Sequence, residues 1–266
     1  MGSALLDLLF PPRCPFCRRL LTERHALLCP DCQRTLPWLE GDSARRTGEF
    51  FGGCVSPLAY RGPVREAVHR YKFSGSRSYA RPFGQLMAQC VRDQLDGRFD
   101  CVTWAPLSAR RLRQRGYDQA RLLAEEAARV LEVPALPLLS KTRDTPPQSG
   151  LEEAGQRRAN VLGVYRAPDA AAGLRVLLAD DVVTTGSTLS ECARTLLTAG
   201  AAEVVCVTLA QARKDRPEKP LAGAAVRAGK TEVARKQGKQ ADRSGRLLAE
   251  GRALRAPSLH DERPPC

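Results

Sequence analysis

The clearest pattern of hydrophobic and polar positions lies between residues 176 and 207. An apolar run at 176–179 has the length and aliphatic content of a buried parallel strand. After a polar segment, apolar residues recur at the spacing of one helix face, at Leu189, Cys192, Ala193, Leu196 and Leu197. Gly200 stands where a left-handed cap would end that helix, and a second apolar run follows at 204–207. The pattern predicts a strand, a helix and a second parallel strand, with a ligand loop after the first strand.

Two carboxylates and a series of hydroxyl groups fill that loop. Asp180 and Asp181 directly follow the first strand, and burying both without partners would be costly. We therefore expect them at the carboxyl end of the sheet, where α/β folds bind ligands. The residues that follow predict a phosphate cradle of Thr184, Thr185, Gly186, Ser187 and Thr188, in which Gly186 allows close backbone approach and the helix start adds partial positive charge. An ordinary N-capped helix is the alternative, but a cap needs only one hydroxyl.

Carboxylates beside a phosphate cradle indicate a ligand that offers hydroxyl donors as well as phosphate. A ribose 5-phosphate offers both. Asp180 and Asp181 would accept hydrogen bonds from two vicinal ring hydroxyls, while Mg²⁺ would screen any further phosphates. A Rossmann dinucleotide-binding domain is excluded because no G-x-G-x-x-G follows any predicted strand.

The same alternation of elements extends over most of the chain. Apolar runs predict further strands at 54–60, 99–106 and 160–165, and helical spacing predicts helices starting at Pro63, at 86–95 and at 120–131. No periodicity marks 36–53, which we interpret as a linker. The pattern predicts an α/β fold, in which helices flank a parallel sheet, for a domain at 46–212.

A very basic loop follows the predicted strand at 99–106 and leads into the next helix. It contains Arg110, Arg111, Arg113, Arg115 and Gln119. Such residues between a strand end and a helix start suit a pyrophosphate, although a solvated run of charge is the alternative. Lys72, near the end of a predicted helix, could reach an anionic ligand or remain solvated. The segment 138–159, which contains Arg157, predicts a mobile lid because it is rich in Pro, Gly and charge.

The cysteines near the N-terminus indicate a metal site. Cys14 and Cys17 form one C-x-x-C pair, and Cys29 and Cys32 form a second pair after eleven intervening residues. Four thiolates on two knuckles suit tetrahedral Zn²⁺ and leave no open position, so the predicted role is structural. A disulfide is disfavoured by the lack of a signal peptide, and a redox motif by the lack of a surrounding βαβ pattern. Residues 1–45 thus form a predicted zinc module and linker.

Composition and charge separate the end of the chain from its body. Of 266 residues, 43% are hydrophobic, which is enough for a core. The net charge of +13 is concentrated at 211–266, where 14 Lys and Arg face 7 Asp and Glu. Because 213–266 lack aromatic residues and an amphipathic face, we expect a disordered basic tail that binds nucleic acid by charge. A solvated extension without such a role is the alternative. No apolar run is long enough to cross a bilayer and no signal peptide is evident, so we expect a cytoplasmic protein.

The order of these motifs resembles the competence protein F (ComF) family over roughly residues 5–212. Besides the zinc knuckles, the resemblance rests on Tyr60-Arg61-Gly62, Lys72-Phe73, Pro106-Leu107, Arg115-Gly116-Tyr117-Asp118-Gln119, Gln148, Arg157 to Asn160 and the Asp-Asp-Val-Val-Thr-Thr-Gly motif. It implies a type I phosphoribosyltransferase-like fold that binds phosphoribosyl diphosphate with Mg²⁺. It also implies a link to DNA uptake in natural competence.

The resemblance assigns roles to the motif residues. Asp180 and Asp181 become the catalytic pair that contacts ribose, and 184–188 become the 5-phosphate loop. Pyrophosphate and lid contacts are implied for Lys72, Arg113, Arg115, Gln119 and Arg157. One departure is Asp118, where the family usually has Asn, because it adds a negative charge near the proposed pyrophosphate site.

Two classes of function fit this sequence. A phosphoribosyltransferase would move the ribosyl group to a nitrogen nucleophile and needs no Ser, His or Cys nucleophile of its own. A non-catalytic module would use the same pocket to sense nucleotides or to assist the DNA-uptake machinery. The acid pair and predicted lid favour the enzyme, and the zinc knuckles and basic charge favour the module. No base-binding pattern is recognisable, so the acceptor and the oligomeric state stay open.

Overall fold

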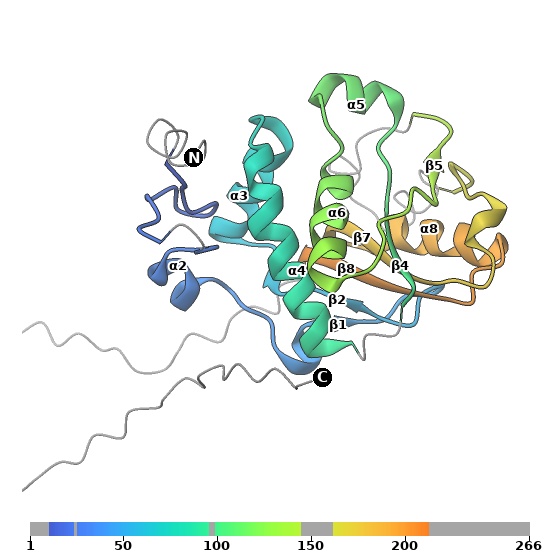
Figure 1. The fold of residues 1–266 in the computed structure, drawn as a ribbon, viewed down its shortest axis with the longest axis horizontal. Coiled ribbons are helices and arrows are strands. Elements are labelled where there is room, and N and C mark those ends of the chain that lie inside the picture. Colours follow the sequence, from blue (N-terminus) through green and yellow to red (C-terminus); the bar gives the residue numbers. More distant parts are fainter. Residues whose placement is uncertain (1–10, 24–25, 96–98, 145–161, 213–266) are drawn as a thin grey trace, which may run out of the picture. The chain divides into compact units, whose positions relative to one another are not determined.

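The structure is a computed structural model that describes residues 11–23, 26–95, 99–144 and 162–212 (Figure 1). Within these residues the main sheet has the strand order β1-β2-β8-β7-β4, and β3 also pairs with β8. The strands are β1 (Arg45–Arg46), β2 (Cys54–Val55), β3 (Leu58–Ala59), β4 (Cys101–Trp104), β7 (Arg175–Val183) and β8 (Glu203–Gln211). Every pairing is parallel except that of β1 with β2. The predicted parallel sheet is confirmed, with an antiparallel strand at one edge.

The sheet is buried on both faces, which explains why its central strands are almost continuously apolar. Leu177 and Ala179 of β7 pack in one core with side chains of α3 (Gly62–Phe73), α4 (Ala80–Gln94) and α6 (Gln119–Leu131). Val176 and Leu178 pack in the opposite core with α8 (Ser187–Thr198). A small hairpin of β5 (Ser140–Lys141) and β6 (Tyr165–Arg166) adds Tyr165 to that second core. The predicted helix layers around the sheet are therefore confirmed.

Parallel pairing brings the carboxyl ends of β4, β7 and β8 to one edge of the sheet. Trp104 is paired with Ala179, and Asp180 is paired with Thr208. Strand β7 continues through both carboxylates to Val183, so the acid pair belongs to the strand itself. The helix that follows ends before Gly200, which has the predicted positive φ of 90°.

Several predicted boundaries were wrong. The basic segment predicted as a loop contains α5 (Ala109–Arg115), which Ser108 caps and Gly116 ends with a φ of 75°. Helix α4 starts at Ala80, after η2 (Arg77–Tyr79), rather than near 86. Its first turn was not predicted because Arg81 and Pro82 interrupt the apolar face there. The strand predicted at 54–60 is divided into β2 and β3, since Pro57 lies between them and lacks an N–H donor. The strand predicted at 160–165 is confined to β6 within the described residues.

The segment 36–53 is part of the folded body, so its prediction as a linker was wrong. It contains η1 (Gly41–Ser43) and β1, and it buries Ala44 and Phe51. The side-chain amide of Gln211 donates to the carbonyl oxygen of Ser43 over 2.6 Å. The segment consists of short turns against the sheet edge, and such turns have no hydrophobic period.

The cysteine-rich segment shares its core with the helices on one face of the sheet. The short helix α2 (Pro30–Thr35) starts directly after Cys29. Phe16 packs against Phe83 of α4, with ring centroids 5.5 Å apart, and both belong to the core that contains Cys14. The predicted boundary at residue 45 stays a prediction.

Two predicted segments fall largely outside the described residues. These are most of the lid, at 145–159, and the basic tail at 213–266. The described start of the lid segment buries Leu138 and Leu139. Among the residues that the structure does describe, no helix has the length and apolar content to cross a membrane.

Candidate functional site

The turn between β7 and α8 gathers hydroxyl groups at a helix N-terminus. Gly186 has a φ of 85° and is the residue before the first turn of α8. A Cβ there would meet nothing closer than 4.0 Å, so the backbone conformation, rather than space, favours glycine. The hydroxyl oxygens of Thr185 and Ser187 are 2.8 Å apart, and the backbone N–H of Ser187 points to Thr185 Oγ1 over 3.4 Å. The geometry suits an anion that accepts several hydrogen bonds.

A lysine from another helix meets the acid pair. Lys72 Nζ, from the last turn of α3, lies 2.8 Å from Oδ1 of Asp181. Burial lowers the pKa of Lys72, but the charge and hydrogen bond of Asp181 outweigh burial, so the pKa is raised overall. Lys72 thus lies at the ribose motif, and its contact with a pyrophosphate stays a prediction.

Asp180 has a different environment from its neighbour. Its Oδ1 accepts the backbone N–H of Asp181 over 2.8 Å. Burial and then the charge of Asp181 raise the pKa of Asp180 to about 8, although Lys72 opposes the shift. At neutral pH Asp180 therefore holds a proton for much of the time. A cation or a hydroxyl donor that binds here would favour release of that proton.

A second group of polar residues approaches Asp180 from the other face of the sheet. Lys141 Nζ lies 5.3 Å from the centroid of the Tyr165 ring. Burial, followed by the charge of Arg111, lowers the pKa of Lys141. The negative charge of Asp180 acts to raise the pKa of Lys141 and the pKa of Tyr165. No sequence pattern identified Lys141 or Tyr165 as site residues, because they lie in two strands of two residues each.

Gln119 is almost fully buried next to this site. Its Oε1 accepts a hydrogen bond from Arg115 Nη1 over 2.8 Å, and its backbone carbonyl accepts the hydroxyl of Tyr71 over 3.0 Å. The side chain is 1% exposed, and its Nε2 has no hydrogen-bond partner among the described residues. A buried amide donor without a partner is unfavourable.

Asp118 uses both carboxylate oxygens to hold the backbone. Oδ2 accepts the N–H of Leu107 over 2.9 Å, and Oδ1 accepts the N–H of Arg121 in the first turn of α6 over 3.2 Å. The carboxylate thus joins the loop after β4 to the start of α6. An Asn would offer one acceptor oxygen in place of two. The negative charge that Asp118 adds is therefore engaged in hydrogen bonds from two backbone N–H groups.

The remaining predicted residues are distributed as follows. Arg115 places its guanidinium 4.9 Å from the centroid of the Phe73 ring, in addition to its bond with Gln119. Arg113 is exposed on α5. Arg157 lies outside the described residues. The structure thus brings Lys72, the acid pair and the hydroxyl loop to one edge of the sheet, while the arginines of α5 lie beside it.

Sequence reasoning missed one contact to the hydroxyl loop. The guanidinium of Arg46 in β1 donates to the backbone carbonyl of Thr184, across 138 residues of sequence. The neighbouring Arg45 points elsewhere, and its Nη2 donates to the carbonyl of Gln94 over 2.5 Å. No periodicity could have identified Arg46, because it belongs to the segment that we predicted as a linker.

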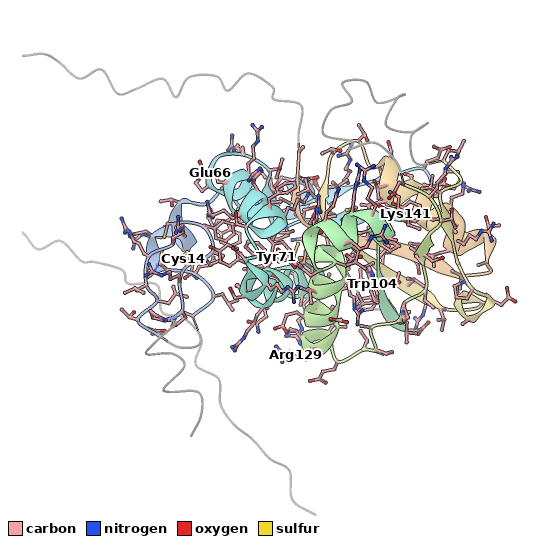
Figure 2. All side chains as sticks on the ribbon, turned by 90° about the horizontal axis from the view of Figure 1, so that it is seen from above. Cys14, Glu66, Tyr71, Trp104, Arg129 and Lys141 are labelled. Carbon is pink, nitrogen blue, oxygen red and sulfur yellow. The ribbon has the colours of Figure 1, made fainter. Side chains whose placement is uncertain are left out.

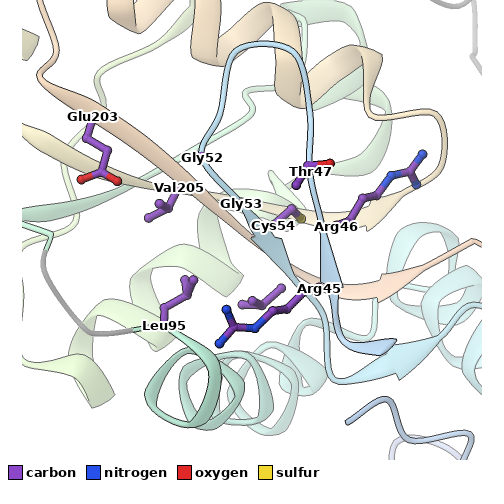
Figure 3. Close-up of a pocket in the computed structure, with 10 residues that line it drawn as sticks. Arg45, Arg46, Thr47, Gly52, Gly53, Cys54, Leu95, Glu203 and Val205 are labelled. Carbon is purple, nitrogen blue, oxygen red and sulfur yellow. The ribbon is translucent and has the colours of Figure 1, made fainter. Parts of the chain in front are cut away.

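A separate cavity of about 530 Å³ opens beside the start of β8 (Figure 3). Its lining includes Arg45, Gly52, Gly53, Leu95, Glu203 and Val205. None of the predicted site residues lines it. The acid pair and the hydroxyl loop are not part of its lining, but Arg46, which donates to the Thr184 carbonyl, is.

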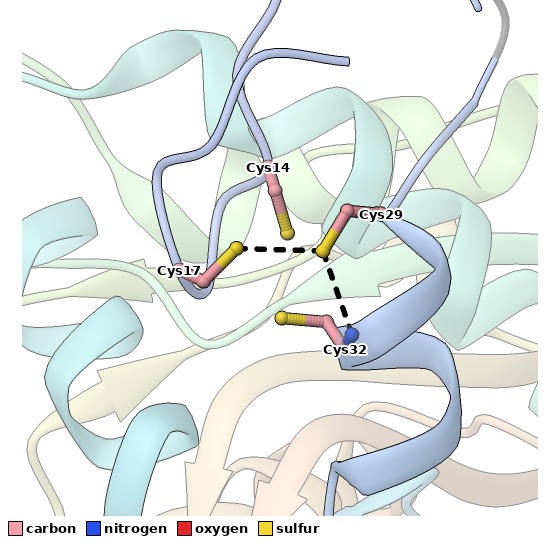
Figure 4. A group of neighbouring side chains, drawn as sticks. All are labelled: Cys14, Cys17, Cys29 and Cys32. Carbon is pink, nitrogen blue, oxygen red and sulfur yellow. Dashed lines mark hydrogen bonds between the residues drawn. The ribbon is translucent and has the colours of Figure 1, made fainter. Parts of the chain in front are cut away.

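The four knuckle cysteines form a compact cluster (Figure 4). The sulfur atoms of Cys14, Cys17, Cys29 and Cys32 all lie within 4.8 Å of one another. The Cys17 and Cys29 sulfurs are 3.4 Å apart, and the backbone N–H of Cys32 points to Cys29 Sγ over 3.5 Å. Four sulfur ligands at this spacing, with a backbone donor to one of them, fit a structural tetrahedral Zn²⁺ site.

Comparison with known proteins agrees with both parts of the chain. The family model "Phosphoribosyl transferase domain" matches residues 118–228, and the model "Double zinc ribbon domain" matches residues 5–61. The DNA utilization protein YhgH of Salmonella typhimurium is 31% identical over 207 residues, which cover 74% of this chain and 90% of that protein. Competence protein F of Haemophilus influenzae is 29% identical over 223 residues, with 75% and 97% covered. The chain therefore belongs to the competence protein F family and combines an N-terminal double zinc ribbon with a phosphoribosyl transferase domain.

Proposed function

We propose that the site at the end of β7 binds phosphoribosyl diphosphate, or a related ribose 5-phosphate ligand, together with Mg²⁺. The observation that carries this proposal is the position of the acid pair, paired through Asp181 with Lys72, directly before the hydroxyl loop at the start of α8. The 5-phosphate would occupy the loop at 184–188, where the helix N-terminus favours an anion. The ring hydroxyls would donate to Asp180 and Asp181.

The charges around the site suit the remaining phosphates. Lys72 is paired with Asp181, and the charge of Asp180 acts on Lys141, so two lysines are available near the acid pair. Asp180 has a pKa of about 8, so a Mg²⁺ that arrives with the diphosphate would stabilise its ionised form. Oxygen ligands from one or two carboxylates and from phosphates are the donor set that Mg²⁺ prefers.

Transfer of the ribosyl group is the enzymatic form of this proposal. The bond between ribose C1 and the diphosphate oxygen breaks, pyrophosphate leaves with the electron pair, and an acceptor nitrogen forms the new bond and loses its proton. The chain's own residues would hold the ring, the 5-phosphate and the leaving group in position. A non-catalytic module that binds the same ligand is the alternative. It is favoured by the names of the relatives, which refer to competence and DNA utilization and to no enzyme activity.

Cytoplasmic location is part of the same proposal. Nine cysteines of the described residues form no disulfide, and most of them are buried in the two cores or in the knuckles. Cysteines in this number without disulfides suit a reducing compartment. The link to DNA uptake follows from family membership.

Calorimetric titration of the full chain with phosphoribosyl diphosphate and Mg²⁺ tests the binding proposal. Asp181→Asn removes the charge that pairs with Lys72, and Gly186→Val forces a side chain onto a positive φ, so both should weaken binding about tenfold or more. Arg166→Gln, on β6, is a matched surface control. Unchanged titration curves for Asp181→Asn and Gly186→Val would show that the loop is not the site. Release of pyrophosphate with a panel of bases would then separate the enzyme from the binding module.

A further inference from the structure

Arg46 reaches the hydroxyl loop from a distant segment of the chain. Its Nη1 donates to the backbone carbonyl of Thr184, the first residue after β7. Arg46 is half-buried and belongs to β1, an edge strand of two residues that pairs with β2. The predicted ligand contacts include no residue of this strand. Arg46 therefore contacts the loop without belonging to the predicted site.

The bond from Arg46 lies where β7 passes into the loop. The carbonyl of Val183, the last residue of β7, accepts the backbone N–H of Ala212 over 2.8 Å. Strand β8 itself ends at Gln211, one residue before Ala212. The next carbonyl of the chain, that of Thr184, accepts the guanidinium of Arg46. Arg46 thus supplies a donor directly beyond the end of the sheet ladder.

This bond fixes the direction of the first peptide unit of the loop. A trans peptide is planar, and its C=O and N–H point in opposite directions. The described residues contain no cis peptide bond. Because Arg46 holds the carbonyl of Thr184, the N–H of Thr185 points away from Arg46. A peptide unit without such a bond can turn over, which is the difference between type I and type II turns.

The rest of the loop is held by its own groups. The hydroxyl oxygens of Thr185 and Ser187 are 2.8 Å apart, and the N–H of Ser187 points to Thr185 Oγ1. Gly186 has its positive φ between them. None of these contacts holds the carbonyl of Thr184. The orientation of the first N–H of the loop therefore depends on Arg46.

We propose that Arg46 is a positioning residue of the 5-phosphate subsite, which holds the peptide between Thr184 and Thr185 with its N–H turned toward the phosphate. This inference rests on the proposed function, because it assigns a role toward the ligand named there. An N–H that is oriented before the ligand arrives donates to the phosphate without the entropic cost of ordering the peptide on binding. A direct bond from the guanidinium to the phosphate is the competing role, and it would depend on charge.

Arg45 provides a matched control on the same strand. Its guanidinium and that of Arg46 point in opposite directions (Figure 3). Arg45 Nη2 donates to the carbonyl of Gln94 at the end of α4. Removal of either arginine takes one positive charge and a bond to a backbone carbonyl from β1. Only the removal of Arg46 should affect the hydroxyl loop.

The first experiment examines the loop in the ligand-free full chain. Amide hydrogen exchange of peptides that cover 182–190 reports on the local opening of the loop. Arg46→Ala should exchange there roughly tenfold faster, because the loop loses a hydrogen bond from a charged donor. Arg45→Ala should exchange like the wild type in these peptides. Since no ligand is present, this result does not depend on the proposed function.

The second experiment separates positioning from charge. Calorimetry measures the affinity for ribose 5-phosphate at about 0.1 M and about 1 M salt, between which the Debye length falls from about 10 Å to about 3 Å. Arg46→Ala should bind roughly tenfold more weakly at both salt concentrations, because the lost bond lies within the protein. Arg46→Lys keeps a charged donor and should recover part of the affinity and part of the exchange protection together. Arg45→Ala should bind like the wild type.

Three outcomes would overturn the proposal. Equal exchange of the loop in the wild type and Arg46→Ala would show that Arg46 does not hold it. Equal losses in Arg46→Ala and Arg45→Ala would assign the effect to the charge or the folding of β1. A loss of affinity that disappears at high salt would make Arg46 a direct partner of the phosphate. A wild type that does not bind ribose 5-phosphate would instead contradict the proposed function, whereas faster exchange in Arg46→Ala would still show that Arg46 orders the loop.

Discussion

Arg70 and Lys72 lie two residues apart in the last turn of α3 and contact different parts of the protein. Arg70 Nη2 donates to the backbone carbonyls of Pro15 over 3.0 Å and Phe16 over 2.7 Å, within the first zinc knuckle. Lys72 Nζ lies 2.8 Å from Asp181 in the ribose motif. One helical turn therefore joins the cysteine module to the acid pair. Figure 2 shows this arrangement in outline, with Cys14 on one side of Tyr71 and the body of the domain on the other.

The residue between them extends the connection. Tyr71 is fully buried and donates its hydroxyl to the carbonyl of Gln119 at the start of α6. The hydroxyl of Tyr117 in turn donates to the backbone carbonyl of Tyr71. Arg70, Tyr71 and Lys72 thus contact the first zinc knuckle, the start of α6 and Asp181, in that order. Because Arg70 holds α3 to the knuckle, we infer that the zinc module supports the position of Lys72.

Arg70→Ala should loosen this support. The substitution leaves the Pro15 and Phe16 carbonyls without their donor, at a cost of roughly 1–3 kcal/mol. We expect the melting temperature to fall by several degrees and the affinity for phosphoribosyl diphosphate to fall with it. Arg65→Ala, an exposed change on the same helix, is the control. If the two variants melt and bind alike, α3 does not connect the module to the site.

The cysteine cluster should hold one Zn²⁺ per chain. Elemental analysis of the purified protein with reduced thiols measures this directly. Cys29→Ser removes a ligand and should lower both the zinc content and the melting temperature, since Cys29 and Phe16 belong to the core shared with α3 and α4. Cys90→Ser, a buried thiol of α4 outside the cluster, should keep its zinc even if it loses stability. A wild-type protein without zinc would contradict the assignment.

Asp118→Asn should weaken the link between the β4 loop and α6 without abolishing it. The amide oxygen can still accept one backbone N–H, but the amide nitrogen cannot accept the other. The expected loss in the free energy of unfolding is about 1 kcal/mol, measured by urea denaturation. Asp118→Ala should lose about twice as much, because both acceptors and the N-cap disappear. Equal stability of Asp118→Asn and Asp118→Ala would mean that only one of the two bonds contributes.

The central βαβ unit and the zinc knuckles could be predicted because their signals are local. A four-residue apolar run, two acids, hydroxyls and a helix face lie in continuous sequence at 176–197, and each C-x-x-C pair fits one turn. Family membership and the α/β fold were predicted from these motifs and are confirmed. The roles of the individual site residues stay predictions.

The rest depended on contacts between distant segments. The pairing of Lys72 with Asp181 joins residues 109 positions apart, and the bond from Arg46 to Thr184 starts in a segment that has no hydrophobic period. Helix α5 escaped prediction because its seven residues include four arginines and present no apolar face. Charge alone suggested a loop, whereas Ser108 and Gly116 cap the helix at both ends.

The raised pKa of Asp180 predicts a dependence of stability on pH. Burial and Asp181 bring the pKa to about 8, whereas a carboxyl in the unfolded chain titrates near 4. Between these values the folded protein keeps a proton that the unfolded chain releases, so the contribution of Asp180 to stability is present below pH 4 and is lost as the pH rises to about 8. Asp180→Asn cannot ionise. Its free energy of unfolding, relative to that of the wild type, should therefore increase between pH 5 and pH 8, as urea denaturation at each pH would show.

The same proton should report on ligand binding. If Mg²⁺ and phosphoribosyl diphosphate bind next to an ionised Asp180, the wild type must release up to one proton when it binds at pH 7, because its pKa there is about 8. Calorimetry in two buffers that differ in ionisation enthalpy measures the number released. Asp180→Asn should release none and should bind with little dependence on pH. Proton release that persists in Asp180→Asn would assign it to another group, and a wild type that releases none would mean that Asp180 stays protonated beside the ligand and donates a hydrogen bond to it.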